Sequence, residues 1–185
     1  MNSAVPIVLS AASLASFVLE RLGYLTALAL EFKGDIKRET RWLAQYGQSI
    51  CTPVAALLVW DFGQPREAIV ILVAVGATSL TCAIVKRLSG RVRPGRENAG
   101  KFLGPSLRSG NYREAFPSSH SACAVALSTV LVGLFPGGAN VFWSLAITCA
   151  LLRYLLDAHW LSDVLAGCAI GYLVAHAVMT MFAGN

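Results

Sequence analysis

Three short segments hold the side chains that could do chemistry. They contribute three cations and two hydroxyl groups that suit an anion: Lys86, Arg93, Arg153, Ser118 and Ser119. An arginine fork binds two oxygens of a phosphate at once, and a lysine supplies a point charge. The two serines stand at the expected start of a helix, where free backbone N–H groups and the helix dipole favour an anion. The set predicts a cage for a phosphoryl group, whose transfer spreads negative charge over its equatorial oxygens.

Two histidines add groups that could attack phosphorus and move protons. His159 and Asp163 are four residues apart, so they share one face if a helix begins there. A carboxylate beside one ring nitrogen would fix the tautomer of His159 and free the other nitrogen to attack phosphorus. His120 could protonate the departing oxygen and then activate water, because histidine titrates near neutral pH. We expect Asp157, two residues before His159, to pair with Arg153 instead.

Each feature alone has a simpler interpretation. A basic loop beside a membrane often binds anionic lipid or fixes topology, and a single histidine at the end of a span is often structural. The His159/Asp163 pair could be half of a metal site, but no clustered carboxylates or cysteines complete it, so we expect no metal and no cofactor. The cysteines lie in apolar runs without a CxxC pair, which indicates small buried hydrophobes.

The composition indicates that lipid surrounds most of the chain. Of its 185 residues 56% are hydrophobic and 14% charged, against roughly 25% charged in an ordinary soluble domain. The mean hydropathy of +0.61 agrees. So many apolar residues cannot all be buried inside one globule of this size. This excludes a disordered chain, a soluble nucleic-acid binder and a small secreted disulfide scaffold, and residues 1–185 are expected to form one domain.

Uncharged runs predict an all-α bundle of six transmembrane helices. A span needs about 20 mostly apolar residues. The expected spans are one tilted helix within 4–30, then 42–60, 68–85, two helices within 115–152 separated by Pro136-Gly137-Gly138, and one from residue 164 onward. The remaining segment, 86–114, is longer than most structureless connections, and such loops are usually functional.

If these spans alternate, all three chemical segments lie at one membrane face. Residues 31–41, 86–114 and 153–163 then share a side and carry thirteen of the fifteen lysines and arginines. Arg66 stands on the opposite side, and the side of Arg21 is ambiguous. The positive-inside rule would place the cation-rich side in the cytoplasm.

The three segments together resemble the phosphatidic acid phosphatase type 2 family, in its integral-membrane bacterial branch. The family's first motif is a lysine, six residues and Arg-Pro; its second is Pro-Ser-Gly-His; its third is Ser-Arg, five residues, a histidine, three residues and an aspartate. The matching residues are Lys86, Arg93, Pro94, Pro117, Ser118, His120, Arg153, His159 and Asp163. The resemblance covers about 68–182. Two positions depart from the pattern: Ser119 replaces the glycine, with its backbone N–H still available, and Leu152 replaces the serine before the arginine.

The resemblance implies a six-helix fold and metal-independent removal of phosphate from a lipid phosphate or diphosphate. It implies a phosphohistidine on His159, with His120 as acid and then base, and Asp163 orienting the nucleophile. Lys86, Arg93, Arg153, Ser118 and Ser119 would hold the phosphate. The expected location is the cell membrane, in a bacterium its inner membrane, as a multi-pass protein. Family members often act at the extracytoplasmic face, so the side of the active site stays open.

Several alternatives remain at this stage. The substrate could be phosphatidate, phosphatidylglycerophosphate, a polyprenyl diphosphate or a phosphorylated glycolipid. The same motifs would serve a lipid phosphotransferase that passes phosphate to an alcohol. A non-catalytic protein that binds anionic lipid, or a transporter, would use only the basic loop. A soluble vanadate-dependent haloperoxidase shares the anion cage, but spans of lipid length argue against it. The sequence indicates no oligomeric state.

Overall fold

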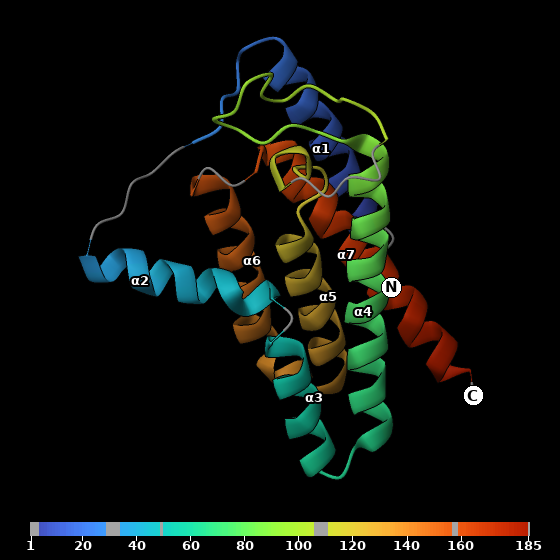
Figure 1. Cartoon of the computed structure of the whole chain (residues 1–185). Helices are drawn as coiled ribbons and strands as arrows, with labels where there is room; N and C mark the ends of the chain where they lie inside the picture. The colour runs from blue at the N-terminus through green and yellow to red at the C-terminus, as the bar shows by residue number, and fades with distance from the viewer. Residues whose placement is uncertain (1–3, 29–33, 49, 106–110, 157–158, 185) are drawn as a thin grey trace.

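Apolar runs separated by glycine, proline and charged residues form helices throughout the computed structural model of the chain (Figure 1). The structure describes residues 4–28, 34–48, 50–105, 111–156 and 159–184. The α-helices in this part are α1 (Ala4–Arg21), α2 (Gly34–Leu43), α3 (Cys51–Asp61), α4 (Pro65–Ser89), α5 (Ser119–Leu134), α6 (Ala139–Leu155) and α7 (Leu161–Ala183). Short 3-10 helices are η1 (Ala44–Gly47), η2 (Asn111–Arg113) and η3 (Pro136–Gly138).

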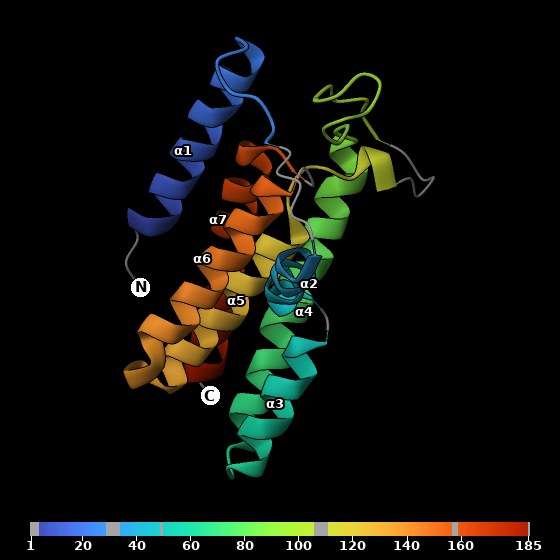
Figure 2. The same cartoon turned by 90° about the vertical axis from the view of Figure 1, so that its left-hand side faces the viewer.

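Helix α5 is the centre of the bundle. It contacts α4, α6 and α7, and its residues from Ser121 to Leu131 are buried. Chain direction alternates from α4 to α7, so the ends of α4 and α6 and the starts of α5 and α7 meet at one end of the bundle (Figure 1). We call this end the site end. Helix α1 packs on α7 and α3 packs on α4, while α2 runs across the bundle and is seen end-on in Figure 2.

The helix lengths support a multi-pass membrane protein, with four candidate spans among the described residues. The helices that are long and apolar enough to cross a membrane are α1, the continuous segment Pro136–Leu155, α4 and α7. Helix α3 has 11 residues and α5 has 16. At 1.5 Å per residue both are shorter than a hydrocarbon core of about 30 Å. The all-helical architecture is therefore as expected, whereas six spans are not confirmed.

Two of the expected spans differ from the helices that form. Residues 42–60 do not make one helix, because α2 ends at Leu43 and η1 turns the chain before α3 begins. In η1 the backbone of Gly47 passes so close to the carbonyl of His120 that any side chain there would overlap it. The first helix stops at Arg21 instead of continuing toward residue 30. Gly23, with a positive φ of 79°, turns the chain just after it.

Two glycines bring α7 against α5. A Cβ atom at Gly167 would lie 2.4 Å from the carbonyl oxygen of Ser118, and one at Gly171 would lie 2.1 Å from that of Ala122. These contacts require glycine, because real Cβ atoms do not approach other atoms so closely. The backbone of Ser118 also donates a hydrogen bond to the carbonyl oxygen of Asp163, at 2.9 Å. The starts of the two helices are therefore fixed relative to each other.

Candidate active site

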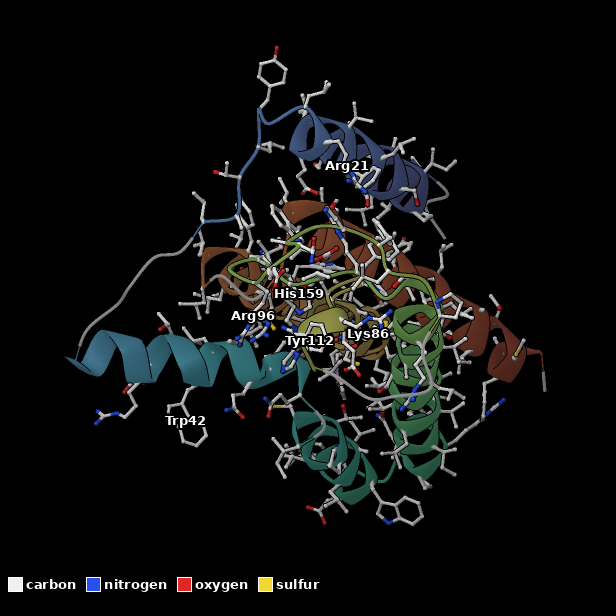
Figure 3. All side chains as sticks on the ribbon, turned by 45° about the horizontal axis from the view of Figure 1, so that its top comes forward. Arg21, Trp42, Lys86, Arg96, Tyr112 and His159 are labelled. Carbon is white, nitrogen blue, oxygen red and sulfur yellow. The ribbon has the colours of Figure 1, made fainter. Side chains whose placement is uncertain are left out.

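The sequence-predicted residues come together at the site end. Lys86 ends α4, Ser119 and His120 begin α5, and Arg153 lies in the last turn of α6. His159 precedes α7 and Asp163 lies in its first turn. Figure 3 shows Lys86 and His159 near the start of α5, whereas Trp42 points outward from α2. His120 interacts electrostatically with four of the others: Arg153, His159, Lys86 and Arg93.

His159 is fully buried and presents one free nitrogen. Its Nδ1 atom lies 2.7 Å from the carbonyl oxygen of Ala115, and because a carbonyl only accepts, the proton is on Nδ1. Its Nε2 atom is buried and has no hydrogen-bond partner among the described residues. Burial lowers the pKa of His159 to about 4, although the Asp163 carboxylate opposes the shift. The ring is therefore neutral at neutral pH, with the Nε2 lone pair available to attack an electrophile.

Asp163 does not make the direct hydrogen bond to His159 that its spacing predicts. Its Oδ2 atom is 3.7 Å from His159 Nδ1, and the hydrogen bond goes to Ala115 instead. That oxygen accepts from the backbone N–H of Trp160 at 3.0 Å, which caps the start of α7. The other oxygen, Oδ1, lies 2.5 Å from Nη1 of Arg91. Asp163 thus acts on His159 through its charge and through the turn that carries the ring.

His120 faces a cavity that is largely apolar. Its Nε2 atom is buried without a hydrogen-bond partner among the described residues, as in His159. A cavity of about 700 Å³ reaches His120 and Ser119 and continues between α3, α4 and α5. Apolar side chains and glycine line much of its length, including Leu72, Val75, Gly76 and Cys123. A hydrocarbon group could therefore reach His120 from the side of the bundle.

The three cations line the same region from different elements. Lys86 Nζ donates to the carbonyl oxygen of Glu114 at 3.0 Å, and Arg93 Nη2 reaches the same oxygen at 3.5 Å. Burial lowers the pKa of the Arg93 guanidinium, against the opposing effect of the Glu114 and Asp163 carboxylates. The Nε atom of Arg153 is buried and has no hydrogen-bond partner among the described residues. Partly buried cations grouped in this way favour an anionic ligand.

Ser118 and Ser119 differ in which of their groups remain available to a ligand. Ser118 is completely buried, and its hydroxyl caps α5 through Ser121, with the two hydroxyl oxygens 2.9 Å apart. Its backbone N–H is bound to the Asp163 carbonyl. Ser119 lines the cavity beside His120. Leu152, which replaces a polar residue of the family motif, is buried.

Sequence reasoning missed two charged residues that the structure brings to this site. Arg91 appears in the sequence as one more cation of a basic loop, yet it is buried and paired with Asp163. Glu20 appears as the end of an apolar run, yet its side chain is only 4% exposed and pairs with Arg91. A signal was present for Glu20, because an acid beside lipid-length apolar sequence needs a partner. Asp157, expected to pair with Arg153, lies outside the described residues, as do Lys33 and Arg108.

Comparison with known families points to the same region of the chain. The sequence profile of the PAP2 superfamily matches residues 67–185, which include the three motif segments. A lipid A 1-phosphatase of Rhizobium johnstonii is 34% identical over 95 residues, which are 51% of this chain and 39% of the relative. One of Porphyromonas gingivalis is 40% identical over 86 residues, which are 43% of this chain and 19% of the relative. The match thus spans less than two-fifths of either relative.

A solved structure shares the fold. The crystal structure of the transmembrane PAP2-type phosphatidylglycerolphosphate phosphatase from Bacillus subtilis superposes with a TM-score of 0.65. The superposition covers 100% of this chain and 89% of that chain, with 18% sequence identity. The likeness extends through α1, α2 and α3, which precede the region that the family profile matches.

Proposed function

Because this chain belongs to the PAP2 superfamily, we propose that it is a membrane lipid phosphatase that works through a phosphohistidine on His159. It hydrolyses a phosphomonoester or diphosphate of a lipid and requires no metal. The observation that carries this proposal is a pair of histidines, His159 and His120, whose buried Nε2 atoms have no hydrogen-bond partner among the described residues, with His120 lining a largely apolar cavity. Its active site lies at one face of the cell membrane, in a bacterium the inner membrane.

Phosphate binding comes first in this mechanism. Lys86, Arg93 and Arg153 surround the phosphoryl oxygens and offset their charge. Ser119 contributes from the start of α5, where the helix dipole favours an anion. The hydroxyl of Ser118 is already engaged with Ser121 and its backbone N–H with the Asp163 carbonyl, so we assign Ser118 to holding the start of the helix.

In the first chemical step, the Nε2 lone pair of His159 attacks phosphorus. The bond between phosphorus and the ester oxygen breaks, and its electron pair leaves with that oxygen. Burial and nearby cations lower the pKa of His120, and the bound phosphate dianion offsets those cations, so His120 takes up a proton when the substrate binds. It donates this proton to the oxygen, so the lipid leaves as an alcohol or, from a diphosphate, as a monophosphate. Ala115 keeps the Nδ1 proton in place, and the Asp163 carboxylate stabilises the positive charge that develops on the ring.

In the second step, water replaces the histidine. His120, now neutral, takes a proton from a water molecule while the water oxygen attacks phosphorus. The bond between phosphorus and Nε2 breaks, and its electron pair returns to the His159 ring. Inorganic phosphate leaves, and both histidines regain their starting states.

The apolar cavity beside His120 accommodates the lipid part of the substrate. Because His120 protonates the leaving oxygen, the group attached to that oxygen must lie on the His120 side of the phosphate. That side opens into the cavity between α3, α4 and α5. The sequence relatives named above are lipid A 1-phosphatases, so a lipid phosphorylated on a sugar is the first candidate substrate.

The test is phosphate release by detergent-purified protein in the presence of EDTA. The panel contains lipid A, phosphatidate, phosphatidylglycerophosphate and a polyprenyl diphosphate. We expect release from at least one lipid, unaffected by EDTA, and loss of release in His159→Ala by about 10⁴-fold or more.

The matched control is His176→Ala in α7. His176 donates from Nδ1 to the Tyr172 carbonyl oxygen within the same helix and takes no part in the site, so its loss should leave release unchanged. Full activity in His159→Ala would contradict the nucleophile assignment. Transfer of phosphate to an added alcohol without release to water would instead indicate a phosphotransferase.

A further inference from the structure

A buried ion network lies behind the candidate active site and reaches into α1. Glu20 and Asp163 both pair with Arg91, with nitrogen–oxygen distances of 2.7 Å and 2.5 Å. The side chains of Glu20, Arg91 and Asp163 are 4%, 2% and 0% exposed. Two carboxylates therefore share one guanidinium away from water, which leaves one net negative charge inside the protein.

Aromatic faces enclose the shared guanidinium. The Cζ atom of Arg91 lies 5.4 Å from the ring centroid of Phe17, 5.3 Å from that of Phe102 and 5.4 Å from that of Trp160. All three distances fall within the range of a cation–π interaction. The three rings come from α1, the loop after α4 and the start of α7. Arg91 is thus held at a junction of three elements and has little freedom to move.

Glu20 also binds the first turn of α7 directly. Its Oε1 accepts from the backbone N–H of Ser162 at 3.0 Å, and its Oε2 accepts from the Ser162 hydroxyl at 2.7 Å. Ser13, two turns earlier in α1, donates its hydroxyl to the Ser162 carbonyl oxygen at 2.9 Å. Ser162 precedes Asp163 in the chain, so α1 holds the turn that carries the Asp163 carboxylate.

We propose that Glu20 is a positioning residue for the reaction at His159. It fixes Arg91 and Ser162, which together set the place and the charge of Asp163, 3.7 Å from the His159 ring. The inference rests on the proposed function, and it adds α1 to the catalytic machinery. Glu20 lies outside the region that the family profile matches, which begins at residue 67. It touches neither the cavity nor the phosphate-binding side chains.

Charge removal at Glu20 tests this role. Glu20→Gln keeps the shape of the side chain but removes its charge. The network of Glu20, Arg91 and Asp163 then has no net negative charge to stabilise the positive charge that forms on His159. We expect kcat to fall about ten-fold, with KM changed less than two-fold because the phosphate-binding residues are untouched. Glu20→Asp, which keeps the charge, should recover part of the rate. Glu39→Gln, which removes an exposed carboxylate on α2, should change neither constant.

A second readout does not depend on activity. In protein labelled with ¹⁵N-histidine, the Nδ1 resonance of His159 should shift in Glu20→Gln, because the charge near its hydrogen bond to Ala115 has changed. The Nδ1 resonance of His176, which bonds to the Tyr172 carbonyl oxygen within α7, serves as the internal reference and should not move.

The outcomes separate this inference from the proposed function. An active wild type with unchanged kcat per folded molecule in Glu20→Gln would overturn the positioning role, whether or not the variant is less stable. An unmoved His159 resonance would overturn it as well. A wild type that releases no phosphate would contradict the proposed function, while the His159 resonance would still decide the inference about Glu20.

Discussion

Neither His159 nor His120 has a hydrogen-bond partner for Nε2 in the described part of the chain, but their surroundings suit them to different tasks. His159 is held from behind by Ala115 and lies beside the Asp163 carboxylate. His120 lies at the cavity, and among the described residues the groups that act on it electrostatically are His159 and the cations Arg153, Lys86 and Arg93. A ring fixed by a hydrogen bond and a nearby negative charge suits a nucleophile that becomes positive. A ring facing the leaving group suits proton transfer.

This division predicts different losses for the two histidines at the residue scale. In His120→Ala we expect hydrolysis of an alkyl phosphate to fall about 10²- to 10⁴-fold, because the leaving oxygen needs a proton. A nitrophenyl phosphate needs no such proton, so the variant should release nitrophenol in a rapid burst of about one equivalent. Turnover should then be slow, since water still lacks its base. Stopped-flow absorbance measures the burst.

His159→Ala should show no burst with either substrate, and His176→Ala should behave as the wild type. A steady rate without a burst in His120→Ala would contradict the assignment of His120 to both proton transfers. Equal losses on the alkyl and the nitrophenyl ester would contradict its role as the acid.

Residue types and their spacing predicted several of the side chains that the structure brings together, but they did not predict Arg91 and Glu20 or how the side chains are held. Lys86 and His159 could be selected because their segments are expected at one membrane face and match the spacing of the family motifs. Their partners are backbone carbonyls of Glu114 and Ala115, and a carbonyl has no signature in the sequence. Arg91 could not be singled out, because the sequence of a basic loop does not distinguish a buried arginine from an exposed one.

At the scale of elements, the contact between α5 and α7 decides whether the two histidines face each other. Gly171→Ala places a methyl group against the Ala122 carbonyl, which has no space for it. We expect a loss of about 1–3 kcal/mol in stability, the usual range for overpacking, and a lower thermal midpoint in detergent. Phosphate release should fall as well, because His159 moves with α7 and His120 with α5.

Gly76→Ala in α4 is the control for the loss of stability alone, because Gly76 also lines the cavity that we assign to the lipid. No atom lies within 4 Å of the added Cβ, so the substitution should leave the midpoint unchanged or raise it slightly, since alanine stabilises helix interiors by about 0.5–1 kcal/mol relative to glycine. A Gly171→Ala protein as stable and active as the wild type would show that the two helices tolerate a wider separation.

Uncharged runs predicted where α4, α6 and α7 lie, because a long helix that is buried or faces lipid consists of a continuous run of mostly apolar residues. The same runs misled for α3 and α5. Residues 115–118 are uncharged but do not belong to α5, which begins at Ser119. The helix is therefore shorter than the uncharged run. Between α2 and α3 the break at Gly47 follows from its contact with the His120 carbonyl, a tertiary contact that no local pattern reports.

For the whole molecule, the alternating helices place the site end and the turn between α3 and α4 at opposite ends (Figure 1). Cysteine substitutions at Glu97, in the loop after α4, and at Asp61, at the end of α3, mark these two ends, and both positions are exposed. Of the native cysteines, Cys82, Cys123, Cys149 and Cys168 are buried and Cys51 is partly buried. Cys51→Ser therefore removes the native thiol that is most accessible to a maleimide.

A membrane-impermeant maleimide applied to intact cells should label one of these two positions and not the other. The positive-inside rule predicts that Glu97→Cys is protected until the membrane is opened, because the site end carries the great majority of the cations. Several of these cations, among them Lys86, Arg91, Arg93 and Arg153, are part of the site or of its support. The site alone accounts for their position, so they give no independent evidence on topology. If Glu97→Cys is labelled in intact cells and Asp61→Cys is protected, those site cations do not act as a topology signal, and the reaction that we propose takes place at the outer face. Labelling of both positions from outside would contradict the bundle as a set of membrane-crossing helices.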